Sequence, residues 1–150
     1  KNLPTLPYQE LYTSAYVSEH NQLPPKVLGR YEVLVPLADA DGIAVAGIRT
    51  LPLAVPKASY TAWNPRAIGF GPGNLFPLQG AMSPFSISKS ERASTQDPRL
   101  SIEERYANQE AYVEAVKLAS QRFVKERLLL PEDAERSIER AKADKLSQIK

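Results

Sequence analysis

Residues 108–134 decide the fold class, and they read NQEAYVEAVKLASQRFVKERLLLPEDA. Asn108 is a favoured residue at a helix N-cap, where its side chain accepts a hydrogen bond from a free backbone amide. After it, apolar residues recur at the three- and four-residue spacing of one helix face: Tyr112, Val116, Ala119 and Phe123. We therefore predict an amphipathic helix from Asn108 to about residue 127.

A second helix is predicted after the apolar turn at residues 128–130. Pro131 suits the first helical position, and Glu132 and Asp133 complement the positive end of the helix dipole. Its apolar face to about residue 148 is formed by Ala134, Ile138, Ala141 and Leu146. Packed face to face, the two helices form a helical hairpin.

The composition changes near residue 100, just before this hairpin. The last 50 residues hold 10 acidic and 10 basic side chains, whereas 12 of the 13 prolines and all 7 glycines come earlier. Ser101 and Glu104 have the spacing of a capping box, which predicts a short helix through Tyr106. The last third is therefore helical, and the first two thirds are strands and loops punctuated by proline and glycine.

The strongest β pattern is a predicted hairpin of residues 31–35 and 43–49. Asp39-Ala40-Asp41-Gly42 forms its loop, with Gly42 at positive φ. We expect a third short strand at residues 53–55, bounded by prolines, and mostly loop over residues 60–98.

Residues 1–30 are rich in proline and apolar side chains and show no sustained period. We interpret them as an extended arm, with a short helix near residues 9–16. We expect this arm to lie along a surface that residues outside the arm supply. The chain is thus an α+β fragment of three regions: the arm (1–30), the hairpin and loops (31–100) and the helical hairpin (101–150). These elements make a poor closed core, so we expect them to cover a sheet contributed by a larger fold.

Composition excludes several classes of function. A net charge of +2 provides no basic field for nucleic acid, and no apolar run approaches the length of a membrane span. Without cysteine there is no disulfide and no thiolate nucleophile. The absence of cysteine fits either a reducing or an oxidising compartment, so it does not locate the protein. The start Lys1-Asn2-Leu3-Pro4 has neither an initiator methionine nor a signal pattern, which leads us to expect a processed or truncated chain.

A complete catalytic site is not expected in this chain. His20 is the only histidine, and we interpret it as an exposed loop residue. No serine stands in the Gly-x-Ser-x-Gly elbow of a nucleophile, and the cluster Ser83, Ser86, Ser88 and Ser90 has no general base nearby in sequence. We therefore predict no catalytic residue here.

Two loops resemble ligand-binding motifs incompletely. The loop at residues 39–42 begins like a calcium loop but lacks the third ligand and the distant glutamate, so a hairpin turn is favoured. The glycine-rich residues 69–73 do not match a phosphate-binding pattern, because Pro72 removes a backbone donor. We predict neither a metal site nor a cofactor.

Two side-chain clusters leave alternatives open. Trp63, Asn64 and Arg66 in one loop are candidates to line a substrate pocket, although they are favoured as anchors of the loop. Asp97 and Glu104 could form a catalytic carboxylate pair. Pairing of these acids with Arg99 or Arg105, as a clamp between loop and helix, is the favoured interpretation.

An ordered set of segments resembles the C-terminal region of the bacterial "alpha/beta hydrolase domain" proteins, which are large serine hydrolases. The similarity runs from about residue 24 to residue 141, with small departures at Ile43 and Ala62. The segments that carry it are residues 31–36, 39–42, 46–49, 55–56, 60–64, 84–85, 97–99, 101–106, Tyr112 and 129–134.

The resemblance implies an esterase-like hydrolase whose nucleophilic serine and histidine lie upstream of this chain. Many relatives are exported, which makes a periplasmic or secreted location the expectation. The main hypothesis is a non-nucleophilic C-terminal portion that helps form or cover the fold and pocket, inactive alone. Its partner is then the rest of the hydrolase polypeptide, and a homo-oligomer is compatible with it. The alternative is a stand-alone, non-catalytic interaction module that docks through the arm or the helical hairpin.

Overall fold

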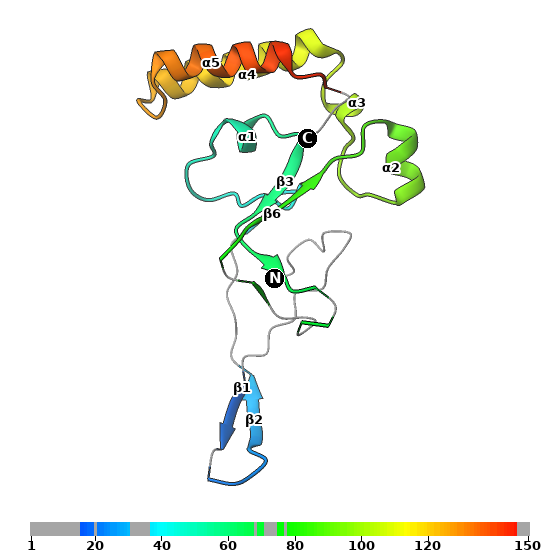
Figure 1. Ribbon diagram of the computed structural model, residues 1–150, viewed down its shortest axis with the longest axis vertical. Coiled ribbons are helices and arrows are strands. Elements are labelled where there is room, and N and C mark those ends of the chain that lie inside the picture. The colour runs from blue at the N-terminus through cyan, green and yellow to red at the C-terminus, as the bar shows by residue number, and fades with distance from the viewer. Residues whose placement is uncertain are drawn as a thin grey trace.

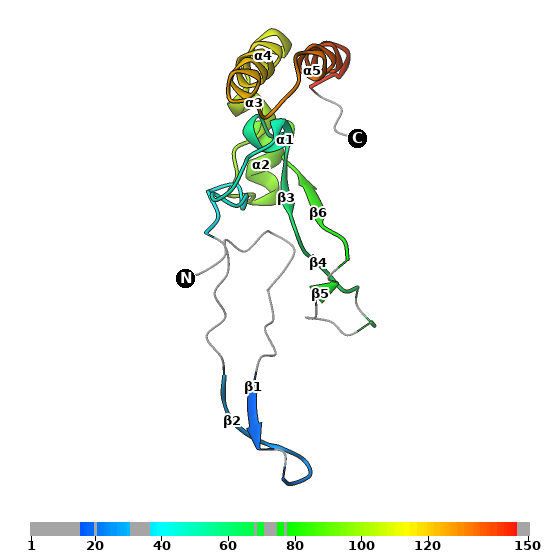
Figure 2. The same cartoon turned by 90° about the vertical axis from the view of Figure 1, so that its left-hand side faces the viewer.

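The computed structural model describes residues 16–19, 21–30, 37–67, 69–70, 75–76 and 78–146, which form a small mixed α+β structure. Figures 1 and 2 show helices α4 (Gln109–Lys125) and α5 (Pro131–Ala143) side by side at one end, and strands β3 (Ala58–Thr61) and β6 (Ala81–Pro84) in the middle. The hairpin of β1 (Tyr16–Glu19) and β2 (Lys26–Arg30) lies at the other end. The elements in chain order are β1 (Tyr16–Glu19), β2 (Lys26–Arg30), α1 (Leu51–Ala54), β3 (Ala58–Thr61), β4 (Asn64–Pro65), β5 (Leu75–Phe76), β6 (Ala81–Pro84), α2 (Lys89–Thr95), α3 (Ile102–Arg105), α4 (Gln109–Lys125) and α5 (Pro131–Ala143).

The predicted helical hairpin is confirmed. The Asn108 side chain accepts a hydrogen bond from the amide of Ala111 at 2.8 Å, and Pro131 begins α5. Both helices end a few residues earlier than predicted. Arg127 turns the chain with a φ of 59°, and the extended backbone of Asp144 ends α5.

Two short helices precede the hairpin. Ser101 and Glu104 form the predicted capping box of α3, with the Ser101 amide 3.0 Å from Glu104 Oε2. Helix α2 was not expected, although Ser88 caps it by accepting a hydrogen bond from the Glu91 amide at 3.1 Å. Residues 60–98 were predicted to be mostly loop, and the described part of that range adds short strand segments and α2 to its loops.

The described strands form three antiparallel pairs: β1 with β2, β3 with β6, and β4 with β5. The central β3–β6 pair runs from Ala58 opposite Pro84 to Thr61 opposite Ala81. Gly80 lies so close to β3 that a Cβ there would be 2.4 Å from the Thr61 carbonyl oxygen. The close approach of the two strands therefore requires glycine at this position.

The second strand of the predicted hairpin, residues 43–49, is replaced by a tight loop. Residues 31–36 lie outside the described part, and residues 43–49 form no strand beyond a bridge between Ala38 and Ala44. Gly42 does adopt the predicted positive φ, at 76°. The Asp39 carboxylate accepts hydrogen bonds from the amides of Asp41 and Ile43, each at 3.0 Å. These local bonds, with Gly47 at a φ of 89°, curl the segment instead of extending it.

The strand predicted at residues 53–55 is also wrong, because Leu51–Ala54 is helix α1. Pro52 lies in its first turn, where a missing amide donor costs nothing. The Thr50 carbonyl accepts hydrogen bonds from the amides of Leu53 and Ala54, both at 2.9 Å. Of the arm, residues 16–19 and 26–30 form the β1–β2 hairpin, and the helix expected near residues 9–16 falls almost entirely outside the described residues.

The core lies where α1 and β3 meet the helical hairpin. Val55, Tyr112, Val116 and Ala141 form a buried cluster there. Large apolar side chains elsewhere are mostly exposed, including Leu23, Leu37, Phe70 and Leu78. Within the described residues, none of the helices combines the length and the apolar character that a membrane crossing requires.

Candidate functional site

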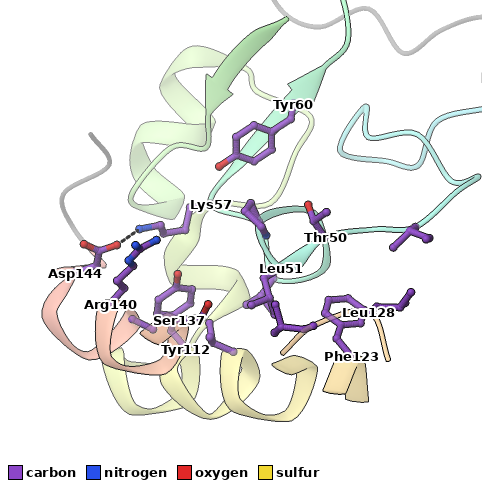
Figure 3. A pocket seen from close by; sticks show the side chains of 16 residues that line it. Thr50, Leu51, Lys57, Tyr60, Tyr112, Phe123, Leu128, Ser137, Arg140 and Asp144 are labelled. Carbon is purple, nitrogen blue, oxygen red and sulfur yellow. Dashed lines mark hydrogen bonds and ion pairs between the residues drawn. The ribbon is translucent and has the colours of Figure 1, made fainter. Parts of the chain in front are cut away.

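A pocket of about 440 Å³ lies between α1, β3 and the helical hairpin, at the edge of the core (Figure 3). This volume is within the usual range for small-molecule sites. Its walls are mainly apolar and come from distant parts of the chain: Ile48, Leu51, Pro52, Val55, Val116, Phe123, Leu128 and Leu129. Such a lining is suited to an alkyl or aryl group.

One corner of the pocket is polar. Lys57 Nζ lies 3.4 Å from Asp144 Oδ2 and 5.5 Å from the centre of the Tyr112 ring. Arg140 lies beside this pair in Figure 3, and Phe123 and Leu128 lie at the opposite end. Among the described residues, the Arg140 guanidinium has no ion-pair partner.

Gln109 fixes the end of α5 next to this corner. Its side-chain amide donates to the carbonyl oxygens of Ala141 at 2.7 Å and Asp144 at 2.9 Å. Its side-chain oxygen accepts a hydrogen bond from the Leu146 amide at 3.0 Å. The carbonyls of Ala141 and Asp144 are thus satisfied without Lys57 or Arg140.

Two phenols also line the pocket. Burial raises the pKa of Tyr60, and burial together with the nearby Asp144 and Tyr60 raises the pKa of Tyr112. Both groups therefore stay protonated at neutral pH and can donate a hydrogen bond. Within the described part of the chain, neither hydroxyl has a hydrogen-bond partner.

A separate buried cluster is centred on Arg99, whose side chain is 2% exposed. Its Nη2 lies 2.6 Å from Asp97 Oδ2, and its Nη1 lies 2.9 Å from Ser59 Oγ and 3.0 Å from the Ser83 carbonyl oxygen. Burial by itself raises the pKa of Asp97, but hydrogen bonds from the side chain and amide of Arg99 hold that pKa below its usual value. The cluster ties the loop before α3 to strands β3 and β6.

A second set of charge pairs extends this tie to the tight loop. Arg105 pairs with Asp41 and lies 4.0 Å from the centre of the Phe85 ring. Arg49 pairs with Asp39. Burial by itself raises the pKa of Asp39. Hydrogen bonds from the Arg49 side chain and from two backbone amides lower it by more, so the pKa of Asp39 lies below its usual value. These carboxylates serve as loop anchors.

The candidates Trp63, Asn64 and Arg66 lie outside the pocket. The Trp63 carbonyl accepts a hydrogen bond from Thr61 at 2.6 Å, and Asn64 pairs with Phe76 in the β4–β5 pair. Arg66 is exposed. Their role in binding stays a prediction.

The predicted pairing is confirmed for Asp97 and Arg99, although it ties the loop to the strands and not to a helix, and Glu104 pairs with Arg92 instead of Arg105. His20 lies outside the described residues, so the structure does not place it. Among the described residues, no group of three or more acidic or histidine side chains is arranged to hold a metal ion.

Sequence reasoning missed the polar corner. Lys57, Tyr60, Tyr112, Arg140 and Asp144 are spread over nearly 90 residues and share no motif. The only available clue was that Tyr112 lies on the predicted buried face of its helix.

In a comparison with protein families, a family described as "Alpha/beta hydrolase domain" matches residues 9–139. The match includes α1, β3, α4 and most of α5, and it ends just before Arg140. Searches among curated proteins and among solved structures each returned no match.

Proposed function

The chain belongs to the alpha/beta hydrolase domain family, and on that premise we propose that it is a non-nucleophilic C-terminal portion of an ester hydrolase. In this role the pocket between α1, β3 and the helical hairpin holds the apolar part of an ester. The nucleophilic serine and the catalytic histidine come from chain upstream of residue 1.

The observation that carries this proposal is the lining of the pocket. Among the residues that form it, the hydroxyl of Ser137 is engaged with the Asp133 carbonyl oxygen at 2.7 Å, and no histidine is present. A Ser-His-acid triad needs an imidazole within hydrogen-bond reach of the nucleophile. The lining is therefore suited to binding an apolar group and does not supply the attacking residue.

The exposed apolar side chains support an association with further polypeptide. Leu23 is 94% exposed, Leu78 86% and Phe70 74%. Burial of such side chains against a partner surface stabilises each by roughly 1.5–3 kcal/mol. The rest of the hydrolase polypeptide is the partner that the family membership favours.

The test is the ester selectivity of the complete gene product that contains this chain. Leu128 lines the pocket and is about half exposed, so a Leu128→Trp variant narrows the pocket without disturbing the core. We expect kcat/KM to fall about tenfold for a long-chain p-nitrophenyl ester and little for the acetate.

Leu118→Trp is the matched control, because Leu118 is also exposed and does not line the pocket. It should leave the preference for chain length unchanged. Equal effects of both variants on both esters would contradict the assignment of the pocket.

A further inference from the structure

The polar corner of the pocket carries an excess of positive charge. Lys57 and Arg140 are opposed by the single carboxylate of Asp144, which leaves one positive charge. The side chain of Lys57 is 17% exposed and that of Asp144 is 59% exposed, so water screens the anion more than the cation. The field inside the pocket therefore favours a negative group.

The carbonyls of Ala141 and Asp144 at this helix end do not need these cations. Lysine and arginine near the end of a helix often satisfy its free carbonyls. Here Gln109 already donates to the carbonyl oxygens of Ala141 and Asp144. Arg140 makes no ion pair with any described residue, so its guanidinium is available to an additional anion.

The phenols of Tyr60 and Tyr112 add neutral donors next to the cations. Both line the pocket, and Lys57 lies over the Tyr112 ring at 5.5 Å. Neither hydroxyl has a partner among the described residues, and both stay protonated at neutral pH. The corner thus offers a planar guanidinium, an ammonium and hydroxyl donors, a combination that matches a carboxylate.

We propose that the pocket binds an apolar molecule bearing one carboxylate, with the carboxylate between Lys57 and Arg140 and the apolar body directed toward Phe123 and Leu128 (Figure 3). This inference rests on the proposed function and specifies the substrate class: esters whose apolar part carries one free carboxylate. Asp144 disfavours a dianion, because a second negative charge would have no remaining cation to neutralise it.

The test is calorimetric titration of the complete gene product that contains this chain with decanoate and with its neutral analogue decanamide. We expect decanoate to bind at least about tenfold more tightly, as a hydrogen-bonded charge pair contributes on that scale. Arg140→Gln should weaken decanoate binding about tenfold and leave decanamide binding within about twofold. Because Arg140 is exposed and unpaired among the described residues, this variant should fold normally.

Lys142→Gln is the matched control, since Lys142 is an exposed cation of the same helix that does not line the pocket. It should leave the preference for decanoate intact. Equal affinity of the two ligands, absence of binding by both, or an equal effect of Lys142→Gln would overturn the proposal. The binding assay does not depend on ester hydrolysis. If the carboxylate binds but the complete gene product shows no serine-dependent ester hydrolysis, the proposed function is refuted and the carboxylate site is not.

Discussion

Replacement of Arg99 by methionine should destabilise the chain strongly, because it leaves the Asp97 carboxylate buried without its hydrogen-bonded cation. The side chain of Asp97 is 6% exposed, and Arg99 donates to it at 2.6, 2.9 and 3.2 Å. Methionine replaces the aliphatic stem of arginine but not its guanidinium, so the pH dependence described below is needed to separate the unpaired charge from the space left behind.

The magnitude follows from the partners that are lost. Breaking a buried ion pair by removing one member costs about 3–5 kcal/mol. The Ser83 and Pro84 carbonyl oxygens, at 3.0 and 3.2 Å from the guanidinium, also lose a donor. We therefore expect the free energy of unfolding at pH 7 to fall by about 3–5 kcal/mol. Urea unfolding followed by circular dichroism measures this loss.

A second expectation separates the unpaired carboxylate from a general packing defect. In the variant, burial without Arg99 should raise the pKa of Asp97 above its value in the unfolded chain. Stability contributed by such a group is present below the unfolded pKa and is lost as pH rises through the folded one. Acidification from pH 7 to pH 5 should therefore recover part of the loss.

The double variant Asp97→Asn with Arg99→Met should also be more stable than Arg99→Met alone. Arg122→Met is the matched control, because the Arg122 side chain is 57% exposed, and its cost should be about 0.5 kcal/mol or less. A loss below about 1 kcal/mol for Arg99→Met, or no recovery in acid, would refute the reasoning.

Two further predictions concern stability. Ser120→Ala should stabilise the chain by about 1 kcal/mol, because the fully buried Ser120 hydroxyl has no hydrogen-bond partner among the described residues and alanine favours the helix. A lower urea midpoint for this variant would contradict the prediction. The free energy of unfolding of the unsubstituted chain should fall as pH drops below about 4. The pKa values of Asp39 and Asp97 are lowered in the folded state. The stability that these two groups contribute is therefore present above their pKa in the unfolded chain and is lost as they become protonated in the folded chain. Denaturant titrations from pH 7 to pH 2.5 check this, and a constant stability down to pH 3 would count against the two ion pairs.

The helices were predictable because their determinants are local. Asn108 and Ser101 cap helices by bonding amides three residues ahead, and Pro131 fits only a first turn. The same spacing at Ser88 and Glu91 was present in the sequence, and it would have revealed α2 had the pattern been applied there.

The β structure was not predictable in this way. β3 and β6 are separated by about 20 residues, and their pairing depends on the close approach at Gly80 and on the Arg99 cluster. The run from Ile43 to Arg49 has a strong strand composition. This segment nevertheless forms a loop, because the Asp39 carboxylate accepts hydrogen bonds from nearby backbone amides. Such local hydrogen bonds outweigh the intrinsic preference of the residues for a strand.

The pocket was missed for a related reason, whereas the pairing of Asp97 with Arg99 was predicted. Lys57 and Asp144 are 87 residues apart and meet only after α5 folds back on α4. Asp97 and Arg99 are two residues apart, so their pairing was visible in the sequence. Residue spacing thus revealed local charge pairs and not the site that the fold assembles.

The central claim is that the chain contributes a pocket wall and no nucleophile to an ester hydrolase. The most direct measurement is labelling with a fluorophosphonate probe, followed by mapping of the modified residue by mass spectrometry. We predict no labelling of residues 1–150 alone, and labelling of one serine outside this range in the complete gene product. Stoichiometric labelling of a serine within residues 1–150, or no labelling of the complete product, would contradict the claim.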